Sequence, residues 1–355
     1  MTFLRTYARD FGKMLVVFLI FATVPFWIDR VGFYHYIGVE ILIWCTYAMA
    51  YNLALGYTGL PSFGHGAFLG VGAYAMAIYQ LNFDGQSLWL GLFVALLAGA
   101  VAGGLVGLFL AHRRGIYFAL MTVAFGQLFW FITIKWRSVT KGEDGLLNLQ
   151  RLPANFGPVS FNLNNNFDYY FFVLAVFALV IIAMWVLIHS PFGNIIQALK
   201  QNEMRARFIG YDVRVFKWLS FMISAALSSL AGGMFALAQQ SAFPDVMNLQ
   251  WSGIIVMMTI IGGGLVSFWG PVVGAIFYFT IRDLLGAFTE TWMLWFGLTF
   301  MTIILFQPEG IVGIWRKLQP GKSIVPASTV MSIQEIRNEK PYAAISEITG
   351  SKGGD

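Results

Sequence analysis

Residues 190–217 read SPFGNIIQALKQNEMRARFIGYDVRVFK, and they are the one long charged segment in the interior of a chain that is otherwise largely apolar. The flanking runs, residues 169–188 and 218–237, are apolar and about as long as the roughly 20 residues that cross a bilayer core. The sequence therefore predicts that this 190–217 segment is a loop between two membrane spans.

Apolar residues recur within the 190–217 segment at approximately helical spacing. They are Ile195, Ile196, Leu199, Met204, Phe208 and Ile209. The pattern predicts one short amphipathic helix that ends at Gly210, after Pro191 and Gly193 have ended the preceding span. A helix of this kind with several cations could lie on anionic lipid or dock on a partner protein. The segment alone leaves both alternatives open.

The composition lies outside the range of ordinary soluble domains. Of the 355 residues, 58% are hydrophobic and only 11% are charged, and the mean hydropathy is +0.70. These values predict a polytopic membrane protein. The single cysteine, Cys45, lies in an apolar stretch and is expected to be a buried packing residue, because one thiol cannot form an intramolecular disulfide.

Apolar stretches divide the chain into predicted spans. They cover approximately residues 14–27, 37–55, 64–79, 88–111, 115–134, 169–188, 218–237, 252–266, 271–286 and 293–306. The sequence thus predicts an all-α fold with about ten transmembrane helices. Residues 135–168 are rich in Pro, Gly and Asn and predict an external loop. Gly99, Gly103 and Gly107 fall four residues apart, which predicts close approach of a neighbouring helix.

Lys and Arg residues partition to one side of this topology. Most of the 22 cations lie before the first span, after the fourth, in the 190–217 segment and after residue 313. Because cations are enriched on the cytoplasmic side, residues 1–13 are predicted to be a cytoplasmic N-terminus. Residues 14–313 form the predicted transmembrane domain, and residues 314–355 are expected to be a disordered cytoplasmic tail.

No pattern in the chain is typical of an enzyme or a nucleotide site. The four histidines are isolated, and no cysteine pair, paired-carboxylate site or nucleophile elbow is present. Gly321-Lys322-Ser323 resembles the end of a phosphate-binding loop, but the first glycine of that loop would fall on Arg316. We therefore expect no metal, no nucleotide and no cofactor bound by this chain.

Ionisable residues are rare in the predicted spans. Glu40 lies at the outer start of the second span, and Arg282 and Asp283 lie towards the outer end of the ninth. Adjacent helical residues point to different faces, so Arg282 and Asp283 are not expected to form a simple buried pair. An autonomous ion-coupled carrier usually holds charges at mid-membrane. The shortage of such charges disfavours this function and favours a transporter that borrows its energy from a partner.

Two glycine-rich segments, residues 52–72 and 261–274, lie at junctions of spans, and Gly264-Leu265-x-Ser267-Phe268 repeats Gly59-Leu60-x-Ser62-Phe63. Irregular backbone at membrane depth must be buried in protein or line a cavity, so these segments are candidates for the wall of a substrate passage. The candidates are Asn52, Gly56, Gly59, Ser62, Gly64, His65, Gly262, Gly263, Gly264 and Ser267, with Thr122 of the fifth span. Tight helix packing is the alternative explanation of the glycines.

Six stretches, spread from about Ile41 to Gly313, occur in an order that resembles a known family. They are NLALGYTGLPSFGHGAFLGVGAY, GIYFALMTVAFGQ, TKGEDGL, SPFGNIIQALKQNEMRARFIGYDVRVFKWLSFMISAALSSLAGG, GGGLVSFWGPVVGA and QPEGIVG. Together they resemble the LivM-type permease of bacterial ABC importers for branched-chain amino acids. The resemblance implies a type II-importer-like permease fold in the bacterial inner membrane, with no chemistry in the chain itself.

The same resemblance implies a set of partners. They are a second, homologous LivH-type permease, two cytoplasmic subunits that bind and hydrolyse ATP-Mg, and an external amino-acid-binding protein. In this family the stretch that matches residues 198–210 is the coupling helix, which docks on the ATPase. The residues implied in coupling are Gln197, Ala198, Lys200, Asn202, Glu203, Arg205, Ala206 and Gly210. The general importer pattern Glu-Ala-Ala-x-x-x-Gly is kept only at Ala206 and Gly210.

The implied cargo is a branched-chain or related hydrophobic amino acid. Aromatic amino acids, amides and urea are alternatives, because the binding protein makes the first selection. An autonomous carrier and a membrane-embedded enzyme remain as different functions. The first predicts transport by the chain alone, and the second requires a polar catalytic cluster that the sequence lacks.

Overall fold

The described part of the chain is built almost entirely of α-helices, as expected where the backbone must satisfy its own hydrogen bonds in lipid. The computed structural model describes residues 2–28, 34–83, 87–156, 159–307 and 309–317. The helices at the predicted spans are α1 (Thr2–Trp27), α2 (His35–Asn52), α3 (His65–Asn82), α4 (Leu88–Leu110), α5 (Gly115–Lys135), α7 (Asn166–His189), α10 (Val213–Gln239), α11 (Leu249–Gly262), α12 (Gly270–Phe288) and α13 (Trp292–Phe306). The all-α fold is confirmed.

Helix length and composition identify fewer spans than the ten that the sequence predicts. Among the described residues, six helices are long and apolar enough to cross a membrane: His35–Tyr57, which adds the π-helical turn η2 (Leu53–Tyr57) to α2, together with α4, α5, α7, α10 and α12. Met14–Trp27, α11 and α13 are apolar but shorter. The chain is thus a multi-pass membrane protein, and the count of ten spans stays a prediction.

Helices extend beyond the first and the last predicted span. α1 begins at Thr2, before the predicted start of the first span, and α14 (Gly310–Lys317) follows α13. The chain separates into two units after Trp315. Residues 318–355, which hold most of the predicted tail, lie outside the described residues.

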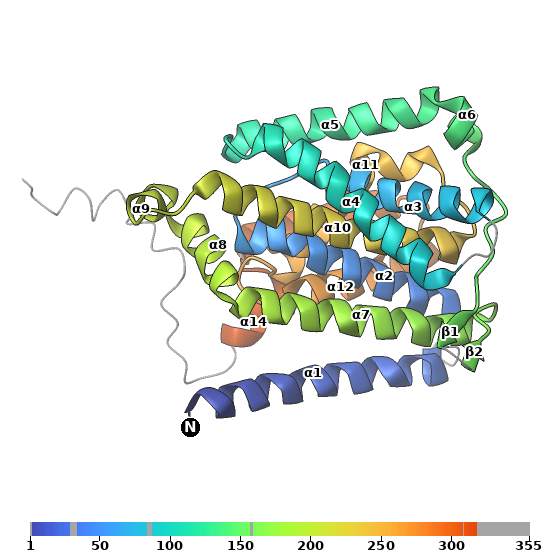
Figure 1. Cartoon of the computed structure of the whole chain (residues 1–355). Coiled ribbons are helices and arrows are strands. Elements are labelled where there is room, and N and C mark those ends of the chain that lie inside the picture. The colour runs from blue at the N-terminus through green and yellow to red at the C-terminus, as the bar shows by residue number, and fades with distance from the viewer. Residues whose placement is uncertain (1, 29–33, 84–86, 157–158, 308, 318–355) are drawn as a thin grey trace, which may run out of the picture. The chain divides into compact units, whose positions relative to one another are not determined.

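α2 is the central helix of the first unit, and it packs against α7, α10, α11 and α12 (Figure 1). It buries nearly every residue from Leu42 to Asn52. Its aromatic side chains build much of the core, because Trp44 stacks on Trp251 of α11 and contacts Phe279 of α12 edge-on. α2 therefore links the helices on either side of it.

Close packing of α4 on α10 follows from the glycine stripe predicted in the sequence. A Cβ added at Gly99 or Gly103 would overlap Ser229 or Ala225 of α10, and one at Gly107 would lie 3.0 Å from Trp218. Only small residues permit such an approach. The predicted role of the stripe in helix packing is confirmed.

The predicted external loop, residues 135–168, contains short ordered elements. They are α6 (Arg137–Thr140), the 3₁₀ turn η3 (Gly142–Asp144) and the antiparallel hairpin of β1 (Ala154–Phe156) and β2 (Val159–Phe161), in which Asn155 lies opposite Ser160. Arg151 joins this loop to α10 by donating hydrogen bonds to the carbonyls of Leu237 and Ala238 at 3.3 and 3.1 Å. A cation there satisfies carbonyls that the helix end leaves without partners.

The 190–217 segment forms two helices, α8 (Pro191–Gln201) and α9 (Glu203–Phe208), where the sequence predicted one. Asn202 adopts an extended conformation between them, and its side-chain oxygen accepts a hydrogen bond from the Arg205 backbone N–H at 3.0 Å. Asn competes with helical hydrogen bonding in this way and is a favoured N-cap. Gly193, predicted to end the preceding span, lies inside α8.

Arg282 forms a partly buried network with Asp283 and Glu40 and not a simple buried pair with Asp283. The guanidinium Nε of Arg282 lies 2.8 Å from a carboxylate oxygen of Asp283, and Nη2 lies 3.3 Å from Glu40 of α2. The prediction considered only the directions of the two Cβ atoms and did not foresee the contact with Glu40. The long Arg side chain reaches its neighbour and, at the same time, α2.

Candidate functional site: the coupling segment and the glycine-rich turns

α8 and α9 lie at the end of the bundle where α7 ends and α10 begins (Figure 1). The Ser190 hydroxyl caps α8 by accepting a hydrogen bond from the Gly193 N–H at 3.2 Å. Ile196 and Leu199 are buried, so one face of α8 packs on the bundle. At the end of α9, Phe208 is 83% exposed, which is unusual for a phenylalanine outside a lipid-facing span. The segment is therefore held on one face and leaves apolar surface on the other.

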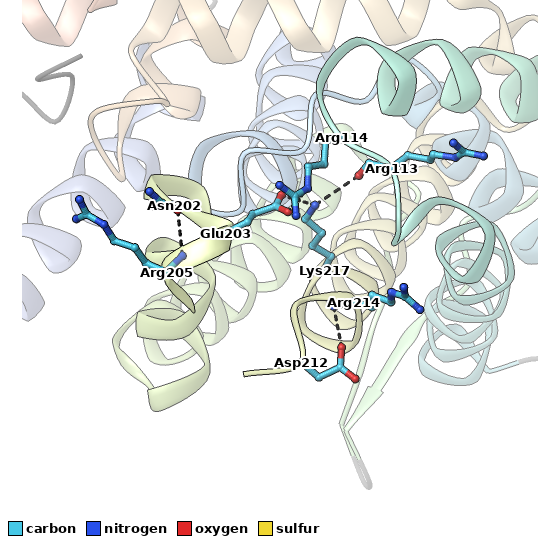
Figure 2. Close-up of polar contacts among 8 residues, drawn as sticks. All are labelled: Arg113, Arg114, Asn202, Glu203, Arg205, Asp212, Arg214 and Lys217. Atoms are coloured by element: carbon cyan, nitrogen blue, oxygen red, sulfur yellow. Dashed lines mark hydrogen bonds and ion pairs between the residues drawn. The ribbon is translucent and has the colours of Figure 1, made fainter. Parts of the chain in front are cut away.

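Glu203, at the start of α9, lies between two cations from other helices. One carboxylate oxygen is 2.5 Å from Nε of Arg114 before α5, and the other pairs with Nζ of Lys217 on α10 (Figure 2). Lys217 is buried and also donates a hydrogen bond to the Arg113 carbonyl at 3.4 Å. The ammonium of Lys217 is thus balanced by Glu203, and α9 is tied to the start of α5 and α10.

Arg205 points away from this cluster, towards the outside of the segment (Figure 2). The side chain is exposed. Gly210 follows the end of α9 and has a backbone φ of 101°, a conformation that glycine adopts without the steric strain of a side chain. Together they present a cationic surface and a sharp change of chain direction.

Lys200 of α8 contacts both glycine-rich segments. Its Nζ donates hydrogen bonds to the carbonyl oxygen of Gly56 at 2.6 Å and to that of Leu265 at 3.2 Å. A Cβ at Gly59 would lie 3.1 Å from Cγ of Lys200, so the Lys200 stem rests on this turn. Partial burial of the ammonium lowers the pKa of Lys200 from its ordinary value.

The two glycine-rich segments also contact each other directly. A Cβ at Gly56 would overlap the Asn52 side chain and come within 2.8 Å of the Gly264 carbonyl oxygen. Gly263 ends α11 with a φ of 90°, and the Ser267 N–H donates a hydrogen bond to its carbonyl at 2.9 Å. The repeated motif therefore marks two turns that pack against each other.

His65 and Gly64 lie in a second buried contact. Nδ1 of His65 is 2.8 Å from the Ser62 hydroxyl, and Nε2 is 2.9 Å from the Ser224 hydroxyl, whose proton is donated to Ala50. This network places the ring proton on Nε2, because Ser224 can then only accept from the ring. A Cβ at Gly64 would overlap the Thr122 carbonyl of α5.

The predicted site residues thus form three contacts that join α2, α3, α5, α8, α10, α11 and α12. The first contact groups Asn52, Gly56, Gly59 and Gly264 with Lys200. The second groups Ser62, Gly64 and His65 with Thr122 and α10. In the third, Gly262 and Gly263 at the end of α11 lie against the start of α12. Close packing explains the glycines, which was the alternative given above. The role of these residues as the wall of a substrate passage stays a prediction.

A cavity of about 590 Å³ lies near the other end of α10 and was not foreseen from the sequence. Its lining includes two carboxylates and several aromatic rings: Trp130, Glu143, Phe235, Phe243, Asp245 and Trp251. α10 has 27 residues, so its rise of 1.5 Å per residue separates this end from α9 by about 40 Å. None of the predicted passage residues lines this cavity.

One signal in the sequence pointed to this cavity. Glu143 belongs to the TKGEDGL stretch, and the adjoining Leu146 pairs with Ala242 in an antiparallel bridge, with backbone hydrogen bonds of 2.9 and 2.8 Å. The bridge brings Glu143 to the segment after α10 that carries Asp245. The pairing of Leu146 with Ala242 could not be predicted from the sequence, because the loop that contains Leu146 has no strand-like periodicity.

Comparison with known proteins agrees with this architecture. A family profile described as "Branched-chain amino acid transport system / permease component" matches residues 34–306. The chain is 27% identical over 323 residues to the high-affinity branched-chain amino acid transport permease LivM of Escherichia coli, covering 85% of this chain and 75% of that protein. It is also 27% identical over 289 residues to a probable LivH permease of Methanocaldococcus jannaschii, covering 76% and 90%.

A relative that matches over a shorter range is named for a different cargo. The guanosine ABC transporter permease NupQ of Bacillus subtilis is 24% identical over 244 residues, which cover 62% of this chain and 72% of that protein. No solved structure matches the chain significantly. The helical bundle, the ordered motifs and the match over residues 34–306 together show that the chain belongs to the family of permease components of branched-chain amino acid transport systems, with a LivM-type sequence.

Proposed function

We propose that this chain is one permease subunit of an ATP-driven importer that carries branched-chain or related hydrophobic amino acids into the cytoplasm. The cargo class is supported by the LivM relatives, which are named as permeases for branched-chain amino acids. The chain would lie in the inner membrane with both termini in the cytoplasm. It would work with a LivH-type permease, two ATP-binding subunits and an external amino-acid-binding protein, and the ATP-binding subunits would hold ATP-Mg and hydrolyse it.

The observation that carries the proposal is the arrangement of α8 and α9. The segment is tied to the bundle through Lys200 and Glu203 while it exposes Arg205, Phe208 and Ile209. Cations beside exposed apolar side chains suit a protein groove with acidic rims. Closure of an ATPase on this surface would move α8 and α9 and so switch access to the passage.

The experiment for this function is copurification from mild detergent, followed by ATPase assays. We expect a tagged chain to retain an ATP-binding subunit and a second permease, with ATP hydrolysis stimulated by leucine-loaded binding protein. Stimulation by phenylalanine, urea or guanosine instead would change the cargo. Uptake by the chain alone in liposomes without ATP would replace the importer by an autonomous carrier.

Arg205→Glu is expected to weaken retention of the ATP-binding subunit by at least about tenfold, because it reverses an exposed charge at the docking surface. Membrane insertion should be unchanged, since Arg205 lies outside the spans. Lys135→Glu makes the same charge change on an exposed residue at the end of α5 and is the control. Equal retention in both variants would remove α9 from the docking surface, and loss of lipid binding alone would favour the lipid-surface alternative.

Gly210→Pro tests the same surface through the backbone. Proline holds φ near −65°, whereas Gly210 needs a φ of 101°. The chain direction after α9 would change, so we expect loss of coupled ATP hydrolysis with normal insertion. Coupling like that of the unaltered chain would contradict this role of Gly210.

The cavity near the end of α10 supports a site for substrate entry from outside. Glu143 and Asp245 can accept hydrogen bonds from an α-ammonium group, and the aromatic rings can cover an apolar side chain. We expect the double variant Glu143→Gln/Asp245→Asn to raise the KM for uptake about fivefold with little change in maximal rate, since exposed charges contribute up to about 1 kcal/mol. Asp144→Asn, an adjacent carboxylate outside the lining, is the control. An unchanged KM would exclude these carboxylates from substrate binding.

A further inference from the structure

The Lys200 ammonium is held by backbone carbonyls. Among the described residues no carboxylate lies within ion-pair distance of it, and its two hydrogen bonds go to Gly56 and Leu265. These carbonyls come from segments that lie 209 positions apart in the sequence. Lys200 therefore joins α8 to the end of η2 and to the turn between α11 and α12.

The Gly56 carbonyl belongs to a helix end that lacks its usual donor, and the Leu265 carbonyl belongs to the turn after α11. In a π-helical turn the Gly56 carbonyl would pair with the N–H five residues on, but that residue is Pro61, which has none. The Leu265 carbonyl follows the left-handed residue Gly263 that ends α11. Cations are favoured at such C-terminal helix ends, where carbonyl dipoles point outwards. Lys200 thus supplies the missing donor to Gly56 and a second hydrogen bond to the turn after α11.

The repeated motif fits this arrangement. Gly59 has a φ of 75° and lies against the Lys200 stem, while Gly264 meets Gly56 from the other turn. A side chain at Gly59 would press on the Lys200 stem, and one at Gly264 would overlap the side chains of Asn52 and Thr259. The two turns thus present the carbonyls of Gly56 and Leu265 to a single ammonium group.

We propose that Lys200 is the positioning residue that transmits movement of α8 to the two glycine-rich turns. This inference rests on the proposed function, in which an ATPase moves α8 and α9. Through η2 the movement reaches α2, the central helix, and through Leu265 it reaches the junction of α11 and α12. The Glu203 cluster serves different helices, α5 and α10, so the two contacts act on separate parts of the bundle.

The test is the number of amino-acid molecules imported per ATP hydrolysed by the complete importer in liposomes. Lys200→Met keeps the length of the stem and removes the ammonium, so import per ATP should fall about tenfold, the effect expected for losing charge-assisted hydrogen bonds. Copurification of the ATP-binding subunits should be unchanged. Lys200→Arg keeps the charge and should restore at least half of the coupling. Lys135→Met, an exposed lysine at the end of α5, should couple normally.

The outcomes separate the two ideas. If the unaltered complex imports with ATP and Lys200→Met imports equally well per ATP, the role of Lys200 is wrong while the proposed function stands. If the unaltered complex shows no ATP-dependent import, the proposed function fails and takes this inference with it. A merely structural role would reduce the amount of complex and leave import per ATP unchanged, which would also overturn the proposal.

A second variant covers the case in which Lys200→Met does not accumulate. Lys200→Gln keeps a neutral N–H donor at this position and removes the charge, so import per ATP should stay below half of that of the unaltered importer. Import per ATP equal to that of the unaltered importer would overturn the proposal.

Discussion

Gly262→Ala is expected to lower the midpoint of thermal unfolding in detergent by about 4 °C or more, or to prevent accumulation of the folded chain. A Cβ at this position would overlap the Gly270 carbonyl oxygen and lie 2.6 Å from the Gly274 amide nitrogen, both backbone atoms of α12. Backbone cannot move aside as a flexible side chain can, so α11 and α12 would have to separate. Overpacking of this kind costs about 1–3 kcal/mol and more when the backbone is the obstacle.

The matched control is Gly253→Ala in the same helix, α11. No atom lies within 4 Å of a Cβ added there. Alanine favours a helix over glycine by about 1 kcal/mol, so the midpoint should stay unchanged or rise. The measurement is a thermal melt followed by size-exclusion chromatography. Equal midpoints for the two variants would mean that the tight contact of α11 with α12 does not exist.

Glu203→Lys is expected to abolish ATP-coupled uptake while the chain still inserts. The change would place three cations together, with the buried ammonium of Lys217 and the guanidinium of Arg114 left without their shared carboxylate. Breaking a buried ion pair costs about 3–5 kcal/mol. α9 would then leave the start of α10, so uptake should fall by at least about a hundredfold at that cost. Uptake and ATP hydrolysis in liposomes measure both effects.

Two further variants isolate the electrostatic cause. The double variant Glu203→Lys/Lys217→Glu restores one opposite-charge contact, so it should recover part of the uptake, as a double-mutant cycle predicts for residues in contact. Glu290→Lys makes the same charge change on an exposed residue and should transport normally. Full uptake by Glu203→Lys itself would show that the cluster plays no part in coupling.

Much of the fold was predictable because its signals are local. Long apolar runs predicted the positions of the helices, and the spacing of Gly99, Gly103 and Gly107 predicted the face of α4 that packs on α10. Residues one turn apart share a face whatever the rest of the chain does. The ordered motifs likewise predicted the family, since each of them is a contiguous stretch of sequence.

Several contacts were missed because they depend on how far a side chain reaches. Arg282 contacts both Asp283 and Glu40, although helical periodicity alone separates the two neighbours. Asn202 divides the 190–217 segment because its side chain caps a new helix, and helix propensity gives only a weak signal at such a position. Local patterns describe the direction of a Cβ atom and say little about the far end of a long or polar side chain.

Hydropathy, charge placement and motif order are therefore enough to specify a multi-pass α-helical permease with a charged segment between two spans. They act through the lipid, which imposes the same requirement on every apolar stretch. The contacts of Lys200 with Gly56 and Leu265, the cavity beside Glu143 and Asp245, and the packing of α11 on α12 join residues that are distant in sequence. Such contacts arise when the helices pack together, since helix ends and glycines then decide which backbone atoms meet.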